Sequence, residues 1–228
     1  MSTRHHIRET RKNGKNGKSK AKPRWCDERV SGHKREPMHA PLHAYESLEA
    51  ALAHGCTATA PESKWVLRLT PALWHFHLAA SPADAPTPHG ETGFDTSEWG
   101  AIEVPLSWQL GELEGSAAVV HDRPIYTNYR YPFSGKAWSL ARFPVPREAN
   151  PVGSYQIAFE VPAAWDGRRV LLVLEGADSN ATVWVDGIEV GYMQDSRLPS
   201  EFDVTAACAS ALSSTPLISP WSTPLINP

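Results

Sequence analysis

Residues 181–192, with the sequence Ala-Thr-Val-Trp-Val-Asp-Gly-Ile-Glu-Val-Gly-Tyr, decide the fold class. Two short runs rich in β-branched residues flank the pair Asp186-Gly187. A two-residue hairpin turn of type I′ needs positive φ at both central residues, and Asp-Gly is one of the pairs that provide it. The stretch therefore predicts a β-hairpin.

Other short strands are expected on the N-terminal side of this hairpin. In residues 73–79, Trp74, Phe76 and Leu78 alternate with polar residues, as in a strand with one buried face. Turn residues bound three further strand-like segments, residues 101–104, 155–161 and 170–174. Many short strands separated by Pro and Gly are typical of an antiparallel sandwich or barrel, so we predict an all-β fold.

Two segments depart from the β pattern. Tyr45, Leu48, Ala51 and Leu52 recur at helical spacing and predict one short helix over residues 45–54. The tail, residues 206–228, contains Ser-Thr-Pro-Leu-Ile twice. Because proline cannot donate to a sheet ladder, we predict that this tail is unstructured and forms no central strand.

Composition excludes several classes of protein. The 228 residues contain only three cysteines, far apart in the sequence, which excludes a disulfide framework and a CxxC zinc site. No apolar run reaches the length of a membrane helix. His75 and His77 would share a strand face, but without a third ligand at a diagnostic spacing we expect them to face water.

Charge is concentrated at the N-terminus. Residues 1–24 hold nine of the 22 Lys and Arg residues but one of the 25 acids, which leaves residues 25–228 acidic. This basic head has a single aliphatic residue, Ile7, so we expect it to be disordered. It lacks the apolar core of a secretory signal, which favours a cytoplasmic protein, although a basic head also suits organelle targeting. The acidic body argues against nucleic acid as the main partner.

A series of motifs occurs in one order along the second half of the chain. The most specific are Asp-Arg-Pro-Ile-Tyr-Thr-Asn at 122–128 and Gly-Tyr-Met-Gln-Asp-Ser-Arg-Leu-Pro-Ser-Glu-Phe-Asp at 191–203. Together these motifs resemble the N-terminal sugar-binding domain of the β-galactosidases of glycoside hydrolase family 2. The resemblance covers residues 25–205, and it is strongest after Trp99. It implies a jelly-roll β-sandwich, the architecture that the strand pattern also favours.

The resemblance also implies that the chemistry lies elsewhere. In that family a TIM barrel carries two glutamates, the nucleophile and the general acid/base of a retaining O-glycoside hydrolase, and Mg and Na sites lie outside the present sequence. We therefore expect a fragment, truncated before the barrel, with no catalytic residue and no cofactor of its own. The resemblance implies a galactoside as substrate of the full-length relative. Association with a barrel domain or formation of a homo-oligomer is also implied.

One residue is predicted to face substrate. The family counterpart of Asn128 hydrogen-bonds the galactosyl group, and an amide can both donate to and accept from a sugar hydroxyl. The alternative is that Asn128 only stabilises a tight loop. Asp122, Asp195 and Arg197 are expected to be structural, with Arg197 binding one of the nearby acids Asp195, Glu201 and Asp203.

The organisation expected from these observations has four parts: a disordered head (1–24), an extension with one helix (25–64), an incomplete sugar-binding jelly roll (65–205) and an unstructured tail (206–228). Trp99, Trp108, Trp184 and Tyr126 could form a stacking platform for sugar, but strand-flanking aromatics are more typical of a core. The rival hypothesis for function is a stand-alone carbohydrate-binding module without enzymatic activity.

Overall fold

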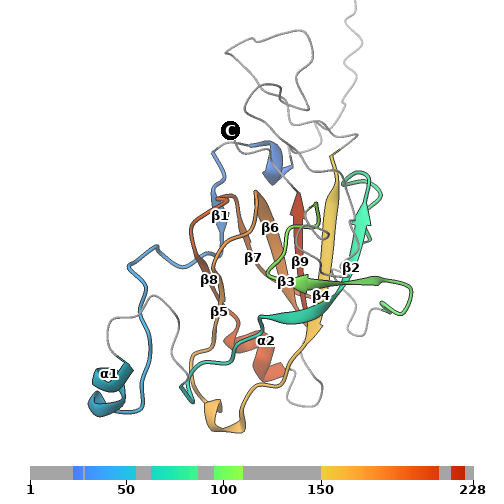
Figure 1. Cartoon of the computed structure of the whole chain (residues 1–228). Coiled ribbons are helices and arrows are strands. Elements are labelled where there is room, and N and C mark those ends of the chain that lie inside the picture. The colour runs from blue at the N-terminus through green and yellow to red at the C-terminus, as the bar shows by residue number, and fades with distance from the viewer. Residues whose placement is uncertain are drawn as a thin grey trace, which may run out of the picture.

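The computed structural model of the chain contains two antiparallel sheets (Figure 1). The structure describes residues 23–27, 29–54, 63–86, 95–109, 150–210 and 217–223; for residues 210 and 217–223 it describes the backbone alone. The elements in chain order are η1 (Arg24–Cys26), β1 (Gly32–His33), α1 (Leu48–His54), β2 (Ala72–Ala79), β3 (Gly100–Val104), β4 (Val152–Ala158), η2 (Ala163–Trp165), β5 (Leu171–Leu174), β6 (Asn180–Val185), β7 (Ile188–Met193), β8 (Ser200–Asp203), α2 (Thr205–Ser210) and β9 (Leu217–Thr223).

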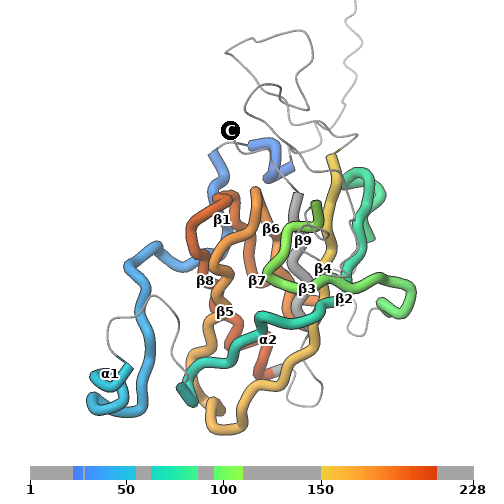
Figure 2. Tube along the Cα trace, viewed as in Figure 1, coloured from blue at the N-terminus to red at the C-terminus, as the bar shows by residue number. Residues whose placement is uncertain are grey.

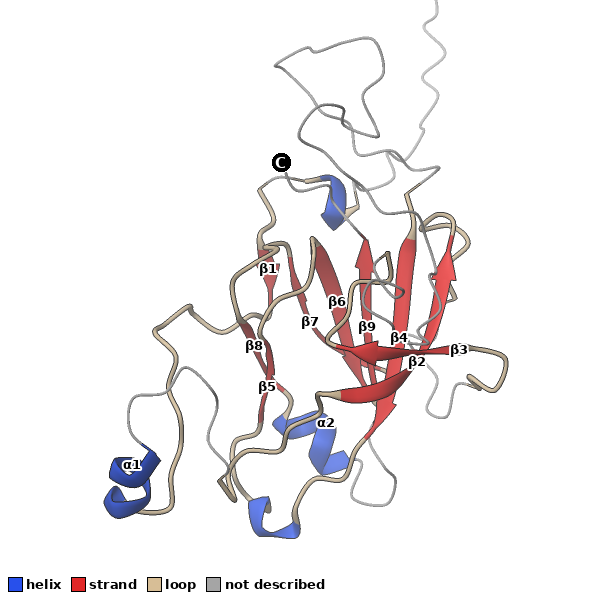
Figure 3. Cartoon of the chain, viewed as in Figure 1, coloured by secondary structure: helices blue, strands red, loops and turns tan. Residues whose placement is uncertain are grey.

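The strands are arranged in a large and a small sheet. The larger has the order β1-β7-β6-β9-β4-β2-β3, and the smaller pairs β5 with β8 (Figure 3). Every described pairing is antiparallel. The predicted all-β sandwich is confirmed.

The predicted hairpin is formed by β6 and β7. Asp186 and Gly187 have φ of 50° and 78°, the positive values that a type I′ turn requires. Val185 pairs with Ile188 across this two-residue turn. A register shift follows between Val183 and Trp184. The Asp-Gly signal therefore located the turn to the residue.

The core lies on one face of the large sheet. Trp74 and Phe76 of β2 are buried there, as the alternation predicted, whereas His75 between them is exposed. The other members of this core come from β3, β6, β7, β8, α2 and the loop after β3, and include Ile102, Trp108, Val183, Val185, Met193, Phe202, Val204 and Cys208. Residues of both sheets thus share one hydrophobic core.

The tail does not follow the prediction. Residues 217–223 form β9, which lies between β6 and β4 in the middle of the large sheet. Its ladder with β6 is continuous through Pro220, which pairs with Val183. Its ladder with β4 runs from Gly153 to Ala158 but skips Tyr155 and Gln156, the positions opposite Pro220 and Ser219. Proline is tolerated because its missing N–H falls on the β4 side, where the ladder is interrupted.

Other boundaries also differ from the prediction. The strand predicted over residues 155–161 is β4, which covers Val152–Ala158. The predicted helix is present as α1 but begins at Leu48, three residues after Tyr45. Arg24, assigned to the disordered head, belongs to η1 and donates a hydrogen bond from Nη1 to Oε1 of Glu189 at 2.6 Å. A sequence pattern could not show this contact, because the two residues are 165 positions apart.

Candidate functional site

The residue predicted to contact sugar, Asn128, lies outside the described residues, as do Asp122 and Tyr126. The substrate-facing role of Asn128 and the structural role of Asp122 therefore stay predictions. The second specific motif, residues 191–203, is fully described, and it forms β7, the following turn and β8.

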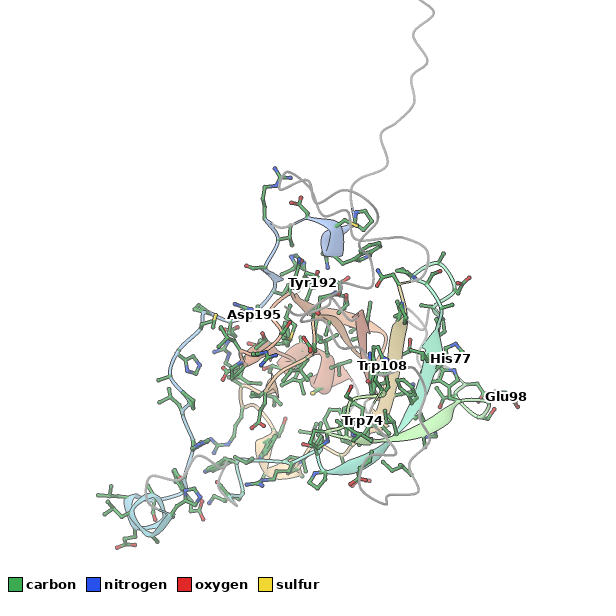
Figure 4. All side chains as sticks on the ribbon, turned by 45° about the horizontal axis from the view of Figure 1, so that its top comes forward. Trp74, His77, Glu98, Trp108, Tyr192 and Asp195 are labelled. Atoms are coloured by element: carbon green, nitrogen blue, oxygen red, sulfur yellow. The ribbon has the colours of Figure 1, made fainter. Side chains whose placement is uncertain are left out.

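Asp195 and Arg197 lie in the turn between β7 and β8. Asp195 is half-buried and Arg197 is exposed; Figure 4 shows Asp195 at the side of the sandwich opposite His77. At the end of β7, the buried Tyr192 donates its hydroxyl hydrogen to Oε1 of Gln194 at 2.8 Å. Burial raises the pKa of this phenol well above its usual range. Tyr192 is therefore a neutral donor that orders the start of the turn.

Two acids of the motif have cationic partners that the sequence did not suggest. Asp203 accepts a hydrogen bond from Nε of Arg169 at 2.8 Å. Oε2 of Glu201 lies 3.1 Å from Nε2 of His39. The pairing of Arg197 with one of these acids stays a prediction.

Arg169 joins two carboxylates. Its Nη2 lies 2.6 Å from Oε1 of Glu36, while its Nε binds Asp203. Hydrogen bonds from Thr205, and then from Arg169, lower the pKa of Asp203 to about 2. Asp203 is therefore ionised at neutral pH and cannot donate a proton there, as a general acid must. This acidic group is an ion-pair network rather than a catalytic dyad.

Residues 31–40, here called the strap, connect the edges of the two sheets (Figure 2). At the large sheet, β1 pairs with β7, and Nζ of Lys34 donates to the carbonyl of Glu189 at 2.8 Å. At the small sheet, Arg35 forms a β-bridge with Phe202, and the amide of Glu36 donates to the carbonyl of Glu201 at 2.9 Å. The strap thus covers strand edges that would otherwise be open to pairing with another chain.

A pocket of about 620 Å³ lies beside the strap. Its walls are formed by strap residues, the start of β7, the end of β8 and α2: Lys34, Arg35, Glu36, Pro37, Ile188, Glu189, Val190, Asp203, Ala206 and Ala207. Several of its charged groups are already engaged by Arg24, Arg169 or backbone carbonyls. The strap and its ion pairs therefore account for much of the pocket lining.

The aromatic residues divide between core and surface. Trp108 and Trp184 are buried, which confirms their assignment to packing and removes them from a sugar-stacking platform. Trp99 is half-buried, and its ring centroid lies 5.7 Å from that of His77. No group of three His, Cys, Asp or Glu that could hold a metal occurs among the described residues. Within the same residues, no helix has the length and apolarity to cross a bilayer.

Comparison with known proteins shows what the chain resembles. Over 181 residues, 79% of its length, it is 36% identical to a β-galactosidase of Psychromonas ingrahamii, and over 184 residues it is 35% identical to one of Alteromonas mediterranea. It spans about 16% of the length of each of these relatives. Among solved structures, a β-glucuronidase of Bacteroides uniformis is 14% identical, with a TM-score of 0.47 over 70% of this chain and 15% of the other.

A family model covers most of the described sandwich. Residues 67–215 match the model of the sugar-binding domain of the glycosyl hydrolases of family 2. The matched range starts before β2, includes the motif at 191–203 and ends just before β9. The chain belongs to glycosyl hydrolase family 2, as a sugar-binding domain of that family.

Proposed function

We propose that this chain supplies the sugar-binding domain of a β-galactosidase that hydrolyses terminal non-reducing β-D-galactosides with retention of configuration. The observation that carries the proposal is the match of residues 67–215 to the family 2 sugar-binding domain, together with identity to proteins named β-galactosidase. The two glutamates that cleave the bond would be contributed by a barrel outside these 228 residues.

The described side chains support a non-catalytic role for the isolated domain. A retaining glycosidase needs two carboxyl groups about 5–5.5 Å apart, one of them protonated at the start of the reaction. Among the described residues, Glu36 and Asp203 are brought together, but both bind the guanidinium of Arg169. Since Asp203 has a pKa of about 2, it cannot supply the acid. We therefore propose that the chain alone does not turn over galactosides.

A chimera tests the proposed function. Residues 67–215 would replace the matching segment of the Psychromonas ingrahamii β-galactosidase, and chromophore release from nitrophenyl β-D-galactoside would be measured. We expect the chimera to release chromophore, and both a version without the segment and the present chain alone to give only the rate of a denatured control. Turnover by the chain alone, or an inactive but folded chimera, would contradict the proposal.

The same chimera tests Asn128. We propose that its side-chain amide hydrogen-bonds the galactosyl group across the domain boundary, as the resemblance implies. Asn128→Ala should lower kcat/KM about tenfold or more, the size expected for loss of a hydrogen bond to bound substrate. An unchanged kcat/KM would indicate instead that Asn128 only stabilises a tight loop.

Binding measurements distinguish the rival function. Galactose or lactose would be titrated into the purified chain while tryptophan fluorescence is followed. A domain that binds sugar only together with a barrel should give no saturable signal. Saturable binding by the chain alone would instead identify a carbohydrate-binding module.

A further inference from the structure

Both ring nitrogens of His39 face oxygen atoms that accept hydrogen bonds. Nδ1 lies 2.7 Å from the carbonyl oxygen of Ala40, and Nε2 lies 3.1 Å from Oε2 of Glu201. A carbonyl oxygen and an ionised carboxylate can only accept, whereas a neutral imidazole carries one N–H. Only the doubly protonated ring can donate to both partners at once.

Either neutral tautomer loses one of these two bonds. With the proton on Nε2, the ring loses its bond to Ala40, which orients it. With the proton on Nδ1, a lone pair points at the carboxylate of Glu201. We propose that His39 is a pH-sensitive latch: the protonated ring fastens the strap to β8, and loss of its proton lets this end of the strap lift from β8. This inference is independent of the proposed function.

The charged groups around His39 show which carboxylate can pair with its ring. From β8, the carboxylates of Glu201 and Asp203 face the strap, and Asp203 is bound by Arg169. On the strap itself, Glu36 also binds Arg169, and Nη1 of Arg35 lies 3.4 Å from the hydroxyl oxygen of Ser200. In the described part of the chain, Glu201 is therefore the carboxylate that pairs with His39.

The direction of the pH effect follows from the same contacts. The hydrogen bond to Ala40, and then the bond to Glu201 and its negative charge, raise the pKa of His39 above its ordinary value of 6.5. The contact of protonated His39 with Glu201 is therefore fully formed below pH 6.5, and it is lost as the pH rises through the raised pKa of His39. The amide of Glu36 donates to the carbonyl of Glu201, the residue that His39 contacts. Hydrogen exchange of this amide should therefore report loss of the His39 contact.

Two NMR readouts on the intact chain test the latch. The first is the titration of the His39 Cε1 resonance, identified by its absence in His39→Gln. We expect it to titrate above 6.5, and Glu201→Gln to bring the midpoint down. The second is the hydrogen-exchange protection factor of the Glu36 amide, which is already corrected for the intrinsic pH dependence of exchange.

The protection factor of Glu36 should fall about two- to fivefold between pH 6 and pH 8, the range that an exposed ion pair contributes. It should be independent of pH in His39→Gln, while His43→Gln, a control histidine in the same N-terminal region, should behave as the parent chain does. A midpoint for His39 at or below 6.5 would overturn the latch. So would a pH-independent protection factor in the parent chain, or an equal fall in His39→Gln.

Discussion

The ring of Phe202 in β8 occupies the space that a side chain on Gly191 in β7 would need. A Cβ added at Gly191 would overlap Cδ1 and Cε1 of that ring. Phe202 is fully buried, so it has little room to move away. The absence of a side chain at Gly191 thus lets the Phe202 ring pack directly against β7.

Gly191→Ala should therefore lower the free energy of unfolding by about 1–3 kcal/mol, the usual cost of overpacking a core. Urea unfolding followed by tryptophan fluorescence measures it. Gly176→Ala is the matched control, because a Cβ there would meet the backbone oxygen of Ser196 at an ordinary 3.4 Å. Equal losses in the two variants would show that contact with Phe202 does not determine the effect.

Replacing Trp108 by alanine should lower the stability of the fold more than replacing Trp99 does. Trp108 is 3% exposed and packs near Phe76, with ring centroids 6.0 Å apart. Trp108→Ala should cost about 3–5 kcal/mol of stability because it leaves a cavity in the core. Trp99→Ala, at the half-buried contact with His77, should cost much less in the same urea experiment. Similar losses would place Trp99 in the core as well.

The pKa of Asp203 should rise when its donors are removed. Because the side-chain hydrogen bond from Thr205 is the largest single cause of the low value and that from Arg169 is the next, Thr205→Val and Arg169→Gln should each raise the pKa. Carboxyl ¹³C titration measures both changes. Arg168→Gln removes the same charge from the neighbouring residue, which lies over the ring of Trp65, and should leave Asp203 unchanged.

The low pKa of Asp203 also makes the free energy of unfolding depend on pH, in a direction that can be stated. The ionised form of Asp203 is favoured by folding, so its contribution is present above the ordinary pKa of 3.8 and disappears as the pH falls through about 2. Thr205→Val should therefore reduce the dependence of stability on pH between these values. A pH dependence identical to that of the parent chain would contradict this account.

Deleting residues 211–228 should abolish cooperative unfolding, because β6 and β4 are joined only through β9 in the described sheet. The matched control removes residues 1–22, whose composition predicts no contribution to the core. Thermal unfolding by circular dichroism compares the two. A sharp transition in the C-terminally shortened chain would show that β9 is dispensable.

The sequence was sufficient to predict those features of the fold that neighbouring residues determine. Asp186-Gly187 located a turn because few residues accept positive φ there, and Trp74 and Phe76 revealed a buried strand face because strand side chains alternate. The motifs at 122–128 and 191–203 also indicated the family from the sequence alone. These features depend on neighbouring residues or on a characteristic order of motifs.

The strap and β9 could not be predicted in the same way. His39, Arg169 and Glu36 have no local signal, since their partners at Glu201 and Asp203 are defined only once β8 lies beside the strap. Pro220 argued against a central strand, and only the interrupted ladder with β4 shows how it is accommodated. The predicted site residue Asn128 lies outside the described residues.

The position of β9 has a consequence for the order of assembly. During synthesis, the half-sheet of β4, β2 and β3 and the half-sheet of β6, β7 and β1 would both leave the ribosome before the strand that joins them. Until residue 223 emerges, each half has an unpaired inner edge, and an unpaired edge in a nascent chain is a site for misassociation. The two parts of the described sheet are therefore joined only after β9 has been synthesised.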